Sequence, residues 1–387
     1  MASSALQEAA NALVDRHEPL RTSFVLDEEG VFRQQVRAAG TLPVVPVDLS
    51  ACADPEATAL ALIREIATRP VDLALDPLAS VTVLLLGEQE HLLVFTLHLL
   101  IADAASLGVF FRELALLYDA EIDARSVELP ELDVQHADWI VWRRERLTAD
   151  RELEMLSWWE AAVRGACWGL PRPNRPRRSG SGRQVRGAPL PREVVDAVGG
   201  LAIRARTTPF AVLAAACGVL LGHHAAHDRV MLSIPIADRD DSRIDNALGF
   251  FVDLVPLCVD LSGEPTPAEL ASRVGRSVFE AYEHRALTAD LIPGATASSD
   301  DLVPVNFAHR LIDRLGVLDL SGCTVIDVPQ AIEHVKVDLT IAVDETNDGL
   351  VVVIEFDDGL FDVVEVEGIV AGYEATLREL VINGAAN

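Results

Sequence analysis

A mixed α/β (α+β) fold in two lobes is the structure that this sequence predicts. Helix-type and strand-type patterns recur in both halves of the chain without a fixed period, so the chain is not a repeat protein. Its 387 residues are also more than one hydrophobic core usually organises. Residues 171–182 are rich in Pro, Arg, Gly and Ser and lack apolar periodicity, as a linker does. We therefore predict lobes at 1–170 and 171–387.

Apolar spacing assigns the elements of the first lobe. In residues 5–17 the apolar side chains share one helical face. Residues 81–86 and 91–100 are apolar β-type runs separated by a polar turn, which is typical of a hairpin. The same criteria predict further helices at 57–68, 107–118, 137–142 and 153–163, and further strands at 20–26 and 34–37.

The second lobe shows the same mixture of patterns. The run 210–224 is very apolar and predicts a helix. Further helices are predicted at 192–205, 267–284 and 364–380, and strands at 229–235, 249–259, 324–328, 338–343 and 350–356. Together these elements support the α/β assignment.

Composition and charge exclude several classes of protein. The net charge of −28 argues against nucleic acid as a partner, because phosphate binding needs concentrated Lys and Arg. The five cysteines are scattered without metal-ligand spacing, so we expect neither a metal site nor a disulfide framework. The longest apolar stretch is about a dozen residues, too short to cross a bilayer. The first residues lack the pattern of a signal peptide, so we expect a cytoplasmic protein without membrane contact.

The pattern around residues 96–106 is the most informative. A strand ending at His98 is followed by a loop with Asp103 and then by a helix near Ser106. This arrangement resembles the His-His-x-x-x-Asp-Gly signature of condensation domains of nonribosomal peptide synthetases, within the chloramphenicol-acetyltransferase-like superfamily. Further segments resemble family motifs in the family order: 17–24, 136–145, 170–176, 208–210, 234–239, 249–257 and 337–340. The chain is therefore identified as a member of this family over nearly its whole length, with a degenerate signature.

The resemblance implies two chloramphenicol-acetyltransferase-like lobes in a V shape with a tunnel between them. It implies acyl or peptidyl carrier proteins as partners, whose phosphopantetheine arm carries the substrate, and no cofactor bound directly. The family's usual first strand is not found ahead of residue 5, so either the gene start is misplaced or the first lobe lacks this strand. The basic stretch 171–182 is either a solvated crossover, which we favour, or a docking patch for an acidic carrier protein.

Two candidate catalytic positions follow from the signature. Leu99 stands where the family has its second, catalytic His, and leucine has neither a lone pair nor a donor. Losing a general base typically costs about 10²–10⁴-fold in rate. His98 takes the place of the first His and is either a displaced base or, as we favour, a hydrogen-bonded residue that supports the loop. On a strand, His98 and Leu99 would face opposite sides.

The remaining site residues are expected to have mainly structural roles. In the family the residue at Asp103 pairs with an Arg matching Arg239, and such a buried pair holds geometry. Ser106 agrees with the pattern, whereas Ala104 replaces the signature Gly and would strain a position with positive φ. Asp253 replaces the usual Asn and is an alternative base, although we favour a strand-end residue bonded to backbone.

The resemblance predicts a diverged condensation-type enzyme of nonribosomal peptide or hybrid polyketide biosynthesis. It would form an amide or ester bond, or perform a related step, on acyl or peptidyl thioesters. An inactive module that recruits a carrier protein or a tailoring enzyme is nearly as well supported. A third alternative is cyclisation, elimination or cycloaddition in the same cavity, for which the sequence gives no specific support.

Overall fold

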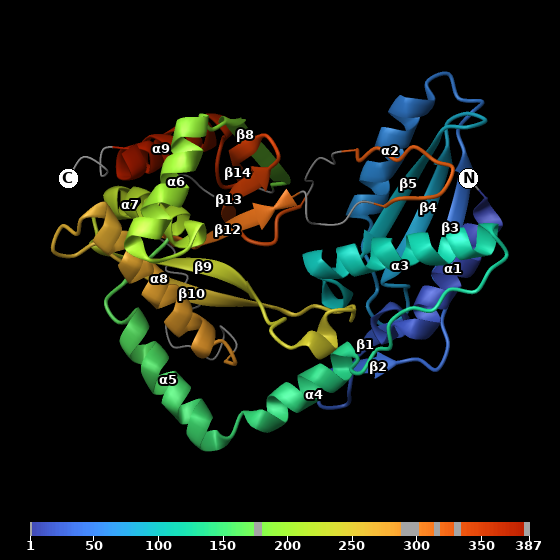
Figure 1. Cartoon of the computed structure of the whole chain (residues 1–387), viewed down its shortest axis with the longest axis horizontal. Helices are drawn as coiled ribbons and strands as arrows, with labels where there is room; N and C mark the ends of the chain where they lie inside the picture. The colour runs from blue at the N-terminus through green and yellow to red at the C-terminus, as the bar shows by residue number, and fades with distance from the viewer. Residues whose placement is uncertain (1, 174–179, 288–301, 313–317, 329–333, 383–387) are drawn as a thin grey trace. The chain divides into compact units, whose positions relative to one another are not determined.

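The computed structural model describes residues 2–173, 180–287, 302–312, 318–328 and 334–382 (Figure 1). It divides the chain into two units. Unit 1 comprises Met1–Glu145, Asp238–Phe251 and Arg314–Pro329, and unit 2 comprises Arg146–Ala237, Val252–Asp313 and Gln330–Asn387. The mixed α/β class is confirmed, but this division differs from the predicted boundary at 170/171. The composition of residues 171–182 indicates an exposed segment. The extent of a unit depends instead on which hydrophobic core the side chains of each segment join. Leu248, Leu318 and Leu320, all from the second half of the sequence, are buried in the core of unit 1.

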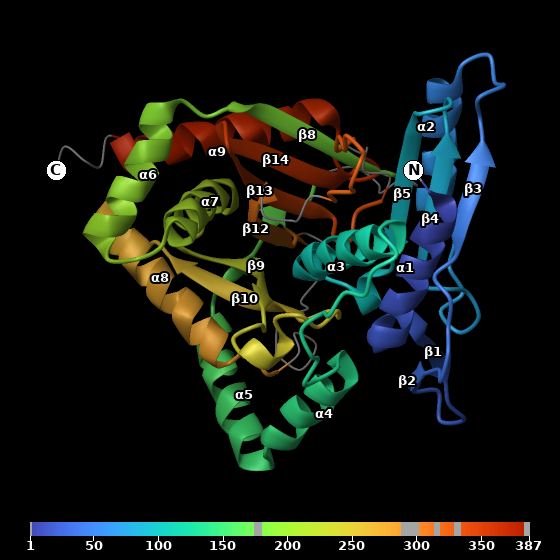
Figure 2. The same ribbon diagram turned by 45° about the vertical axis from the view of Figure 1, so that its right-hand side comes forward.

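Unit 1 is built on a three-stranded sheet of order β3-β4-β5, with β3 (Val44–Asp48), β4 (Ala79–Leu85) and β5 (His91–Leu97). Strands β3 and β4 are parallel, and β4 and β5 are antiparallel, with Val81 opposite Phe95. Helices α1 (Ser3–Arg16) and α3 (Ala104–Ile122) contact each other and share one hydrophobic core with β4 (Figures 1 and 2). The other strands and α-helices in the described part of unit 1 are β1 (Thr22–Leu26), β2 (Phe32–Val36), α2 (Pro55–Thr68) and α4 (His136–Arg146).

The sheet of unit 2 has seven strands among the described residues, in the order β10-β9-β12-β13-β14-β8, with β6 paired to β9. Strands β12 and β13 run parallel, whereas β13/β14, β14/β8 and β10/β9 are antiparallel. The strand bounds are β6 (Cys167–Trp168), β8 (Gly182–Pro189), β9 (Arg229–Ala237), β10 (Val252–Asp260), β12 (Val305–Leu311), β13 (Leu339–Thr346) and β14 (Gly349–Asp357). A separate short pair joins β7 (Leu170–Pro171) to β11 (Leu302–Val303).

Helix α7 (Pro209–Ala225) lies at the centre of unit 2. It contacts α6 (Arg192–Ala205), α8 (Pro267–Glu283), α9 (Val363–Ile382) and β9, so it is enclosed on several sides (Figure 2). This explains why most of its sequence is apolar, which is typical of an enclosed helix. Helix α5 (Ala149–Val163) belongs to the same unit. No single described helix is long and apolar enough to cross a membrane; α6 and α7 reach that length and composition only together, with a 102° bend between them.

The secondary-structure predictions were wrong in a few identifiable places. Residues 324–328 are irregular, although their β-branched residues predict a strand, and Ile326 in this segment is 78% exposed. Strands β3, β8 and β12 were not predicted. Strand β8 is an edge strand with mostly exposed side chains, so it has no apolar alternation to detect. The central part of the predicted linker, 174–179, lies outside the described residues.

Candidate functional site

The loop after β5 does not continue the strand as predicted. Strand β5 ends at Leu97, and residues Leu99–Ile101 form a short 3₁₀ helix, η2. His98 is the N-cap of this helix: its Nδ1 accepts a hydrogen bond from the backbone N of Leu100 at 3.2 Å. The expectation that His98 and Leu99 alternate across a strand was therefore wrong, because the chain turns at His98.

The hydrogen bond to Nδ1 determines what the imidazole of His98 can do. A neutral imidazole has one protonated and one unprotonated nitrogen, so an accepting Nδ1 leaves the proton on Nε2. Burial lowers the pKa of His98 below 6.5, which favours this neutral form. In this state the only lone pair is occupied by a backbone N–H. His98 thus has the properties of a capping residue and lacks a free acceptor for a substrate proton.

Asp103 connects three parts of unit 1. It is the N-cap of α3, and its Oδ1 accepts from the backbone N of Ser106 at 2.7 Å. Its Oδ2 accepts a hydrogen bond from the backbone N of Phe251 at 3.1 Å. The backbone N–H of Asp103 donates to the Gly249 carbonyl at 3.0 Å. The carboxylate also forms an ion pair with Arg239, whose Nη2 lies 3.1 Å from Oδ1 and whose Nε lies 3.3 Å from Oδ2.

The guanidinium of Arg239 is nearly saturated with acceptors. Besides Asp103 it donates to the carbonyl oxygens of Ile244 and Ala247, and it lies 4.2 Å from the ring centre of Phe251. Burial acts to raise the pKa of the Asp103 carboxyl, but the bonds and charge of Arg239 and the bonds from Ser106 outweigh it, so this pKa lies below 3.8. Both side chains are largely buried, so the pair holds the segment 239–251 against the start of α3.

Ser106 completes this arrangement. Its hydroxyl oxygen accepts from Arg239 Nη2 at 2.9 Å and from the backbone N of Gly249 at 3.1 Å. Its single proton has two acceptors within reach, Asp103 Oδ1 at 2.8 Å and the Gly249 carbonyl at 2.7 Å. We refer to Asp103, Ser106, Arg239, Gly249 and Phe251 as the Asp103 cluster. The sequence pattern includes Ser106 but does not reveal that it bridges to a segment 143 residues away.

His136, the first residue of α4, is a buried neighbour of this cluster that the sequence reasoning did not select as a site residue. Its Nε2 lies 3.0 Å from the Phe250 carbonyl, and its ring meets the Phe251 ring edge to face at 4.9 Å. Burial, the main cause, lowers the pKa of His136 below 6.5. A neutral Nε2–H can donate to the carbonyl, so the residue closes the cluster on the side of α4.

Comparisons with known proteins identify the family. The family model described as "Condensation domain" matches residues 1–387. The chain belongs to the condensation-domain family. One of the linear gramicidin synthase proteins from Brevibacillus parabrevis is 31% identical over 97% of this chain, which spans only 7% of that protein. Chondramide synthase from Chondromyces crocatus is 31% identical over 97% of this chain, which spans 10% of that protein. This condensation domain thus has relatives in nonribosomal peptide synthesis.

Solved structures give the same fold. The X-domain from teicoplanin biosynthesis superposes with a TM-score of 0.86 at 24% identity, covering 98% of this chain and 88% of that one. A second structure, described as a complex of the X-domain and OxyB from teicoplanin biosynthesis, gives 0.84 at 24% identity, with coverages of 99% and 86%. These likenesses establish the architecture of the condensation domain.

Within this condensation domain, the structure places the predicted site residues as follows. Asp103, Ser106 and Arg239 come together in one cluster, and Leu99 lies half-buried in η2, next to the capping residue His98. Ala104 is the first residue of α3 and has no positive φ, so the strain expected at this position is absent. Asp253 lies on β10 of unit 2, where it is half-buried and interacts with other residues. It is not part of the Asp103 cluster.

The motif at 17–24 encodes a second buried polar cluster in unit 1. Glu113 on α3 is 1% exposed and lies 2.7 Å from Nε2 of His17, which is fully buried. Arg16 donates from Nε to the same carboxylate at 3.0 Å, and its Nη2 also donates to the Pro130 carbonyl. The sequence marked His17 as part of a motif but gave no signal for Glu113, which occupies an apolar helical face.

A methyl group at residue 249 should test how tightly the Asp103 cluster is closed. A Cβ built on Gly249 would lie 2.5 Å from Cδ2 of His136 and 2.7 Å from Cε2 of Phe251. Both rings are held by their own contacts, so we expect Gly249→Ala to lower the free energy of unfolding by about 2 kcal/mol. Chemical denaturation measures this, with Gly87→Ala as the control, because that position has open space around it. A loss for Gly249→Ala no larger than for the control would contradict the close packing.

Proposed function

We propose that this condensation domain is a binding module that holds a carrier-tethered peptide and recruits a partner enzyme, without transferring an acyl group itself. The observation that carries this proposal is the hydrogen bond from Leu100 N to His98 Nδ1. Leu99 has no proton acceptor, and the neighbouring imidazole uses its lone pair to cap η2. The loop that would supply a general base therefore offers none at either signature position.

Two further features support the recruiting role. Asp103 and Arg239 saturate each other and neighbouring backbone groups, so they stabilise the loop without offering a free group for chemistry. The X-domain of teicoplanin biosynthesis, which has the same fold, is described in complex with a second protein of that biosynthesis, OxyB. A partner enzyme fits a domain that retains the Asp103–Arg239 pair but has the apolar Leu99 at the position of the catalytic base.

Intact-mass analysis tests the proposal. An aminoacyl thioester on a holo-carrier protein and an amine acceptor are mixed with the wild type, with Leu99→His and with Leu100→His. We expect the wild type to give no more product than the reaction without protein. Leu99→His is expected to exceed the wild type, since a general base contributes about 10²–10⁴-fold.

Leu100→His is the matched control, because it adds an imidazole one residue further along, at a side chain that is 37% exposed. It is expected to stay at the background rate. Product formed by the wild type would overturn the proposal and establish the second candidate function, an acyl transfer driven by positioning. That candidate is favoured by the family match over the whole chain and by the intact Asp103–Arg239 pair. Positioning alone can supply roughly 7–11 kcal/mol at its limit.

A further inference from the structure

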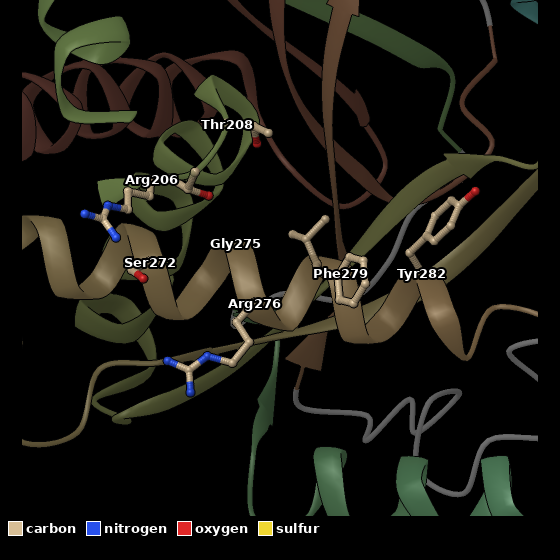
Figure 3. A pocket seen from close by; sticks show the side chains of 9 residues that line it. Arg206, Thr208, Ser272, Gly275, Arg276, Phe279 and Tyr282 are labelled. Carbon is tan, nitrogen blue, oxygen red and sulfur yellow. The ribbon is translucent and has the colours of Figure 1, made fainter. Parts of the chain in front are cut away.

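A recess in unit 2 lies where α8 crosses the corner between α6 and α7. It has a volume of about 550 Å³, and its lining includes Arg206, Thr208, Ser272, Arg276, Phe279 and Tyr282 (Figure 3). The 102° bend between α6 and α7 opens this corner. Helix α8 passes close to it at Gly275, where an added Cβ would lie 2.0 Å from Thr207 Oγ1. The recess therefore belongs to the rigid packing of three helices.

The electrostatics of the recess differ from those of the chain as a whole. The sequence has 60 acidic and 32 basic residues, yet no acidic side chain is among the described residues that line this recess. Arg206 and Arg276 are both exposed, and neither side chain makes a hydrogen bond or an ion pair with a residue that the structure describes. In Figure 3 their side chains extend to the same side of the view, with Ser272 between them. Two uncompensated guanidinium groups at one mouth favour an anionic partner.

An apolar side chain lies beside these cations. Phe279, one turn along α8 from Arg276, is 63% exposed. Ile203, one turn before Arg206 in sequence, is 80% exposed. Arginine and aromatic residues are the types enriched at the energetically important centres of protein interfaces. The combination predicts a partner surface that presents carboxylates around an apolar side chain.

The backbone of Arg206 gives this residue an unusual position. It is the C-cap of α6 with φ of 53° and ψ of 47°, the left-handed region in which glycine is the common residue. An arginine there has a less favourable backbone conformation than glycine, and its side chain makes no hydrogen bond or ion pair with a described residue that would compensate. Glycine can therefore replace it without harm to the fold, which provides a clean test variant.

We propose that this recess, from Arg206 to Phe279, is the docking surface for the acidic face of a carrier protein. Guanidinium groups pair well with carboxylates, often with two parallel hydrogen bonds, and Phe279 would contact an apolar residue between them. The inference rests on the proposed function, because it takes a carrier protein as the partner of this domain. The carboxylates of the carrier, and not the phosphodiester of its phosphopantetheine arm, are the groups recognised.

Calorimetric titration with a peptidyl carrier protein in its apo and holo forms tests the docking surface. The test variant is Arg206→Gly/Arg276→Glu. The control is Arg69→Gly/Arg144→Glu, which changes the net charge equally at two exposed arginines whose side chains make no hydrogen bond or ion pair with a described residue. We expect the test variant to raise Kd for both carrier forms by roughly 10-fold or more, and the control by less than about 2-fold. Circular dichroism checks that both variants are folded.

The other outcomes separate the two proposals. Equal weakening in the test and control variants would mean a long-range charge effect, which overturns the docking surface and leaves the proposed function intact. Binding of the holo form alone would mean that the arm is recognised, which overturns the assignment to carboxylates. A wild type that binds neither form would overturn the carrier-binding part of the proposed function and this inference with it.

Discussion

Arg239→Met is expected to lower the free energy of unfolding of unit 1 by about 3–5 kcal/mol, because it leaves the Asp103 carboxylate charged and buried without its partner. The side chain of Asp103 is only 2% exposed. Burial acts to raise its pKa, but the hydrogen bonds and the charge of Arg239 outweigh this effect and hold the pKa below 3.8. The same substitution also frees the carbonyl oxygens of Ile244 and Ala247. Chemical denaturation followed by tryptophan fluorescence and hydrogen exchange at the start of α3 measures the loss.

A double variant distinguishes a lost charge pair from lost packing. Asp103→Leu/Arg239→Met removes both charges, so it should be less destabilised than the sum of the two single variants. Arg243→Met is the control from the same segment, because its ion pair with Asp241 is partly exposed to solvent and should contribute far less. If Arg239→Met were as mild as Arg243→Met, the Asp103 cluster would not be what holds segment 239–251 to α3.

Glu113→Gln is expected to destabilise unit 1 by about 3–5 kcal/mol at neutral pH, because it removes the buried charge between His17 and Arg16. Burial acts to raise the pKa of Glu113, but the bonds and charges of His17 and Arg16 outweigh it, and the pKa lies below 4.5. A carboxyl whose pKa is lowered by folding contributes its full stability above the unfolded value, here near 4.5. That contribution is lost as the pH falls through the folded pKa.

The difference in stability between wild type and Glu113→Gln should therefore shrink as the pH falls below 4.5. Denaturation curves at a series of pH values give this difference directly. Glu121→Gln is the matched control, because that glutamate is exposed on the same helix. A difference for Glu113→Gln that stays constant down to pH 3 would show that the cluster does not depend on the ionised carboxyl.

Helical and apolar patterns allowed much of the fold to be predicted, because they reflect which face of an element is buried. The apolar run at 210–224 predicted helix α7 correctly. Strand β12 has half-buried polar and basic side chains among its apolar ones, so its central position in the sheet had no clear pattern. Burial on both faces of a sheet is decided by the neighbouring strands, and these are far away in the sequence.

The candidate site was predictable only where residues resemble a motif. The pairing of Asp103 with Arg239 was expected from the resemblance alone, since 136 residues separate them. The cap formed by His98 could not be predicted, because it depends on the chain turning into η2 one residue after the strand ends. Glu113 was missed for a similar reason. Its buried carboxylate is paired with Arg16, at the end of α1, and with His17, which follows this helix, and no local sequence pattern reveals these contacts.

Unit 1 is assembled from three separate segments of the chain, and this has a consequence for its folding during synthesis on the ribosome. Asp103 is translated long before Arg239, and at about 5–20 residues per second the 136 intervening residues take roughly 7–27 s. During that interval the nascent α3 has an unpaired carboxylate at its start, and the core positions of Leu248, Leu318 and Leu320 are still vacant. The N-terminal portion therefore emerges as an incomplete folding unit. It becomes complete only when the later stretches arrive, which makes it a natural client for chaperones that shield exposed apolar surface.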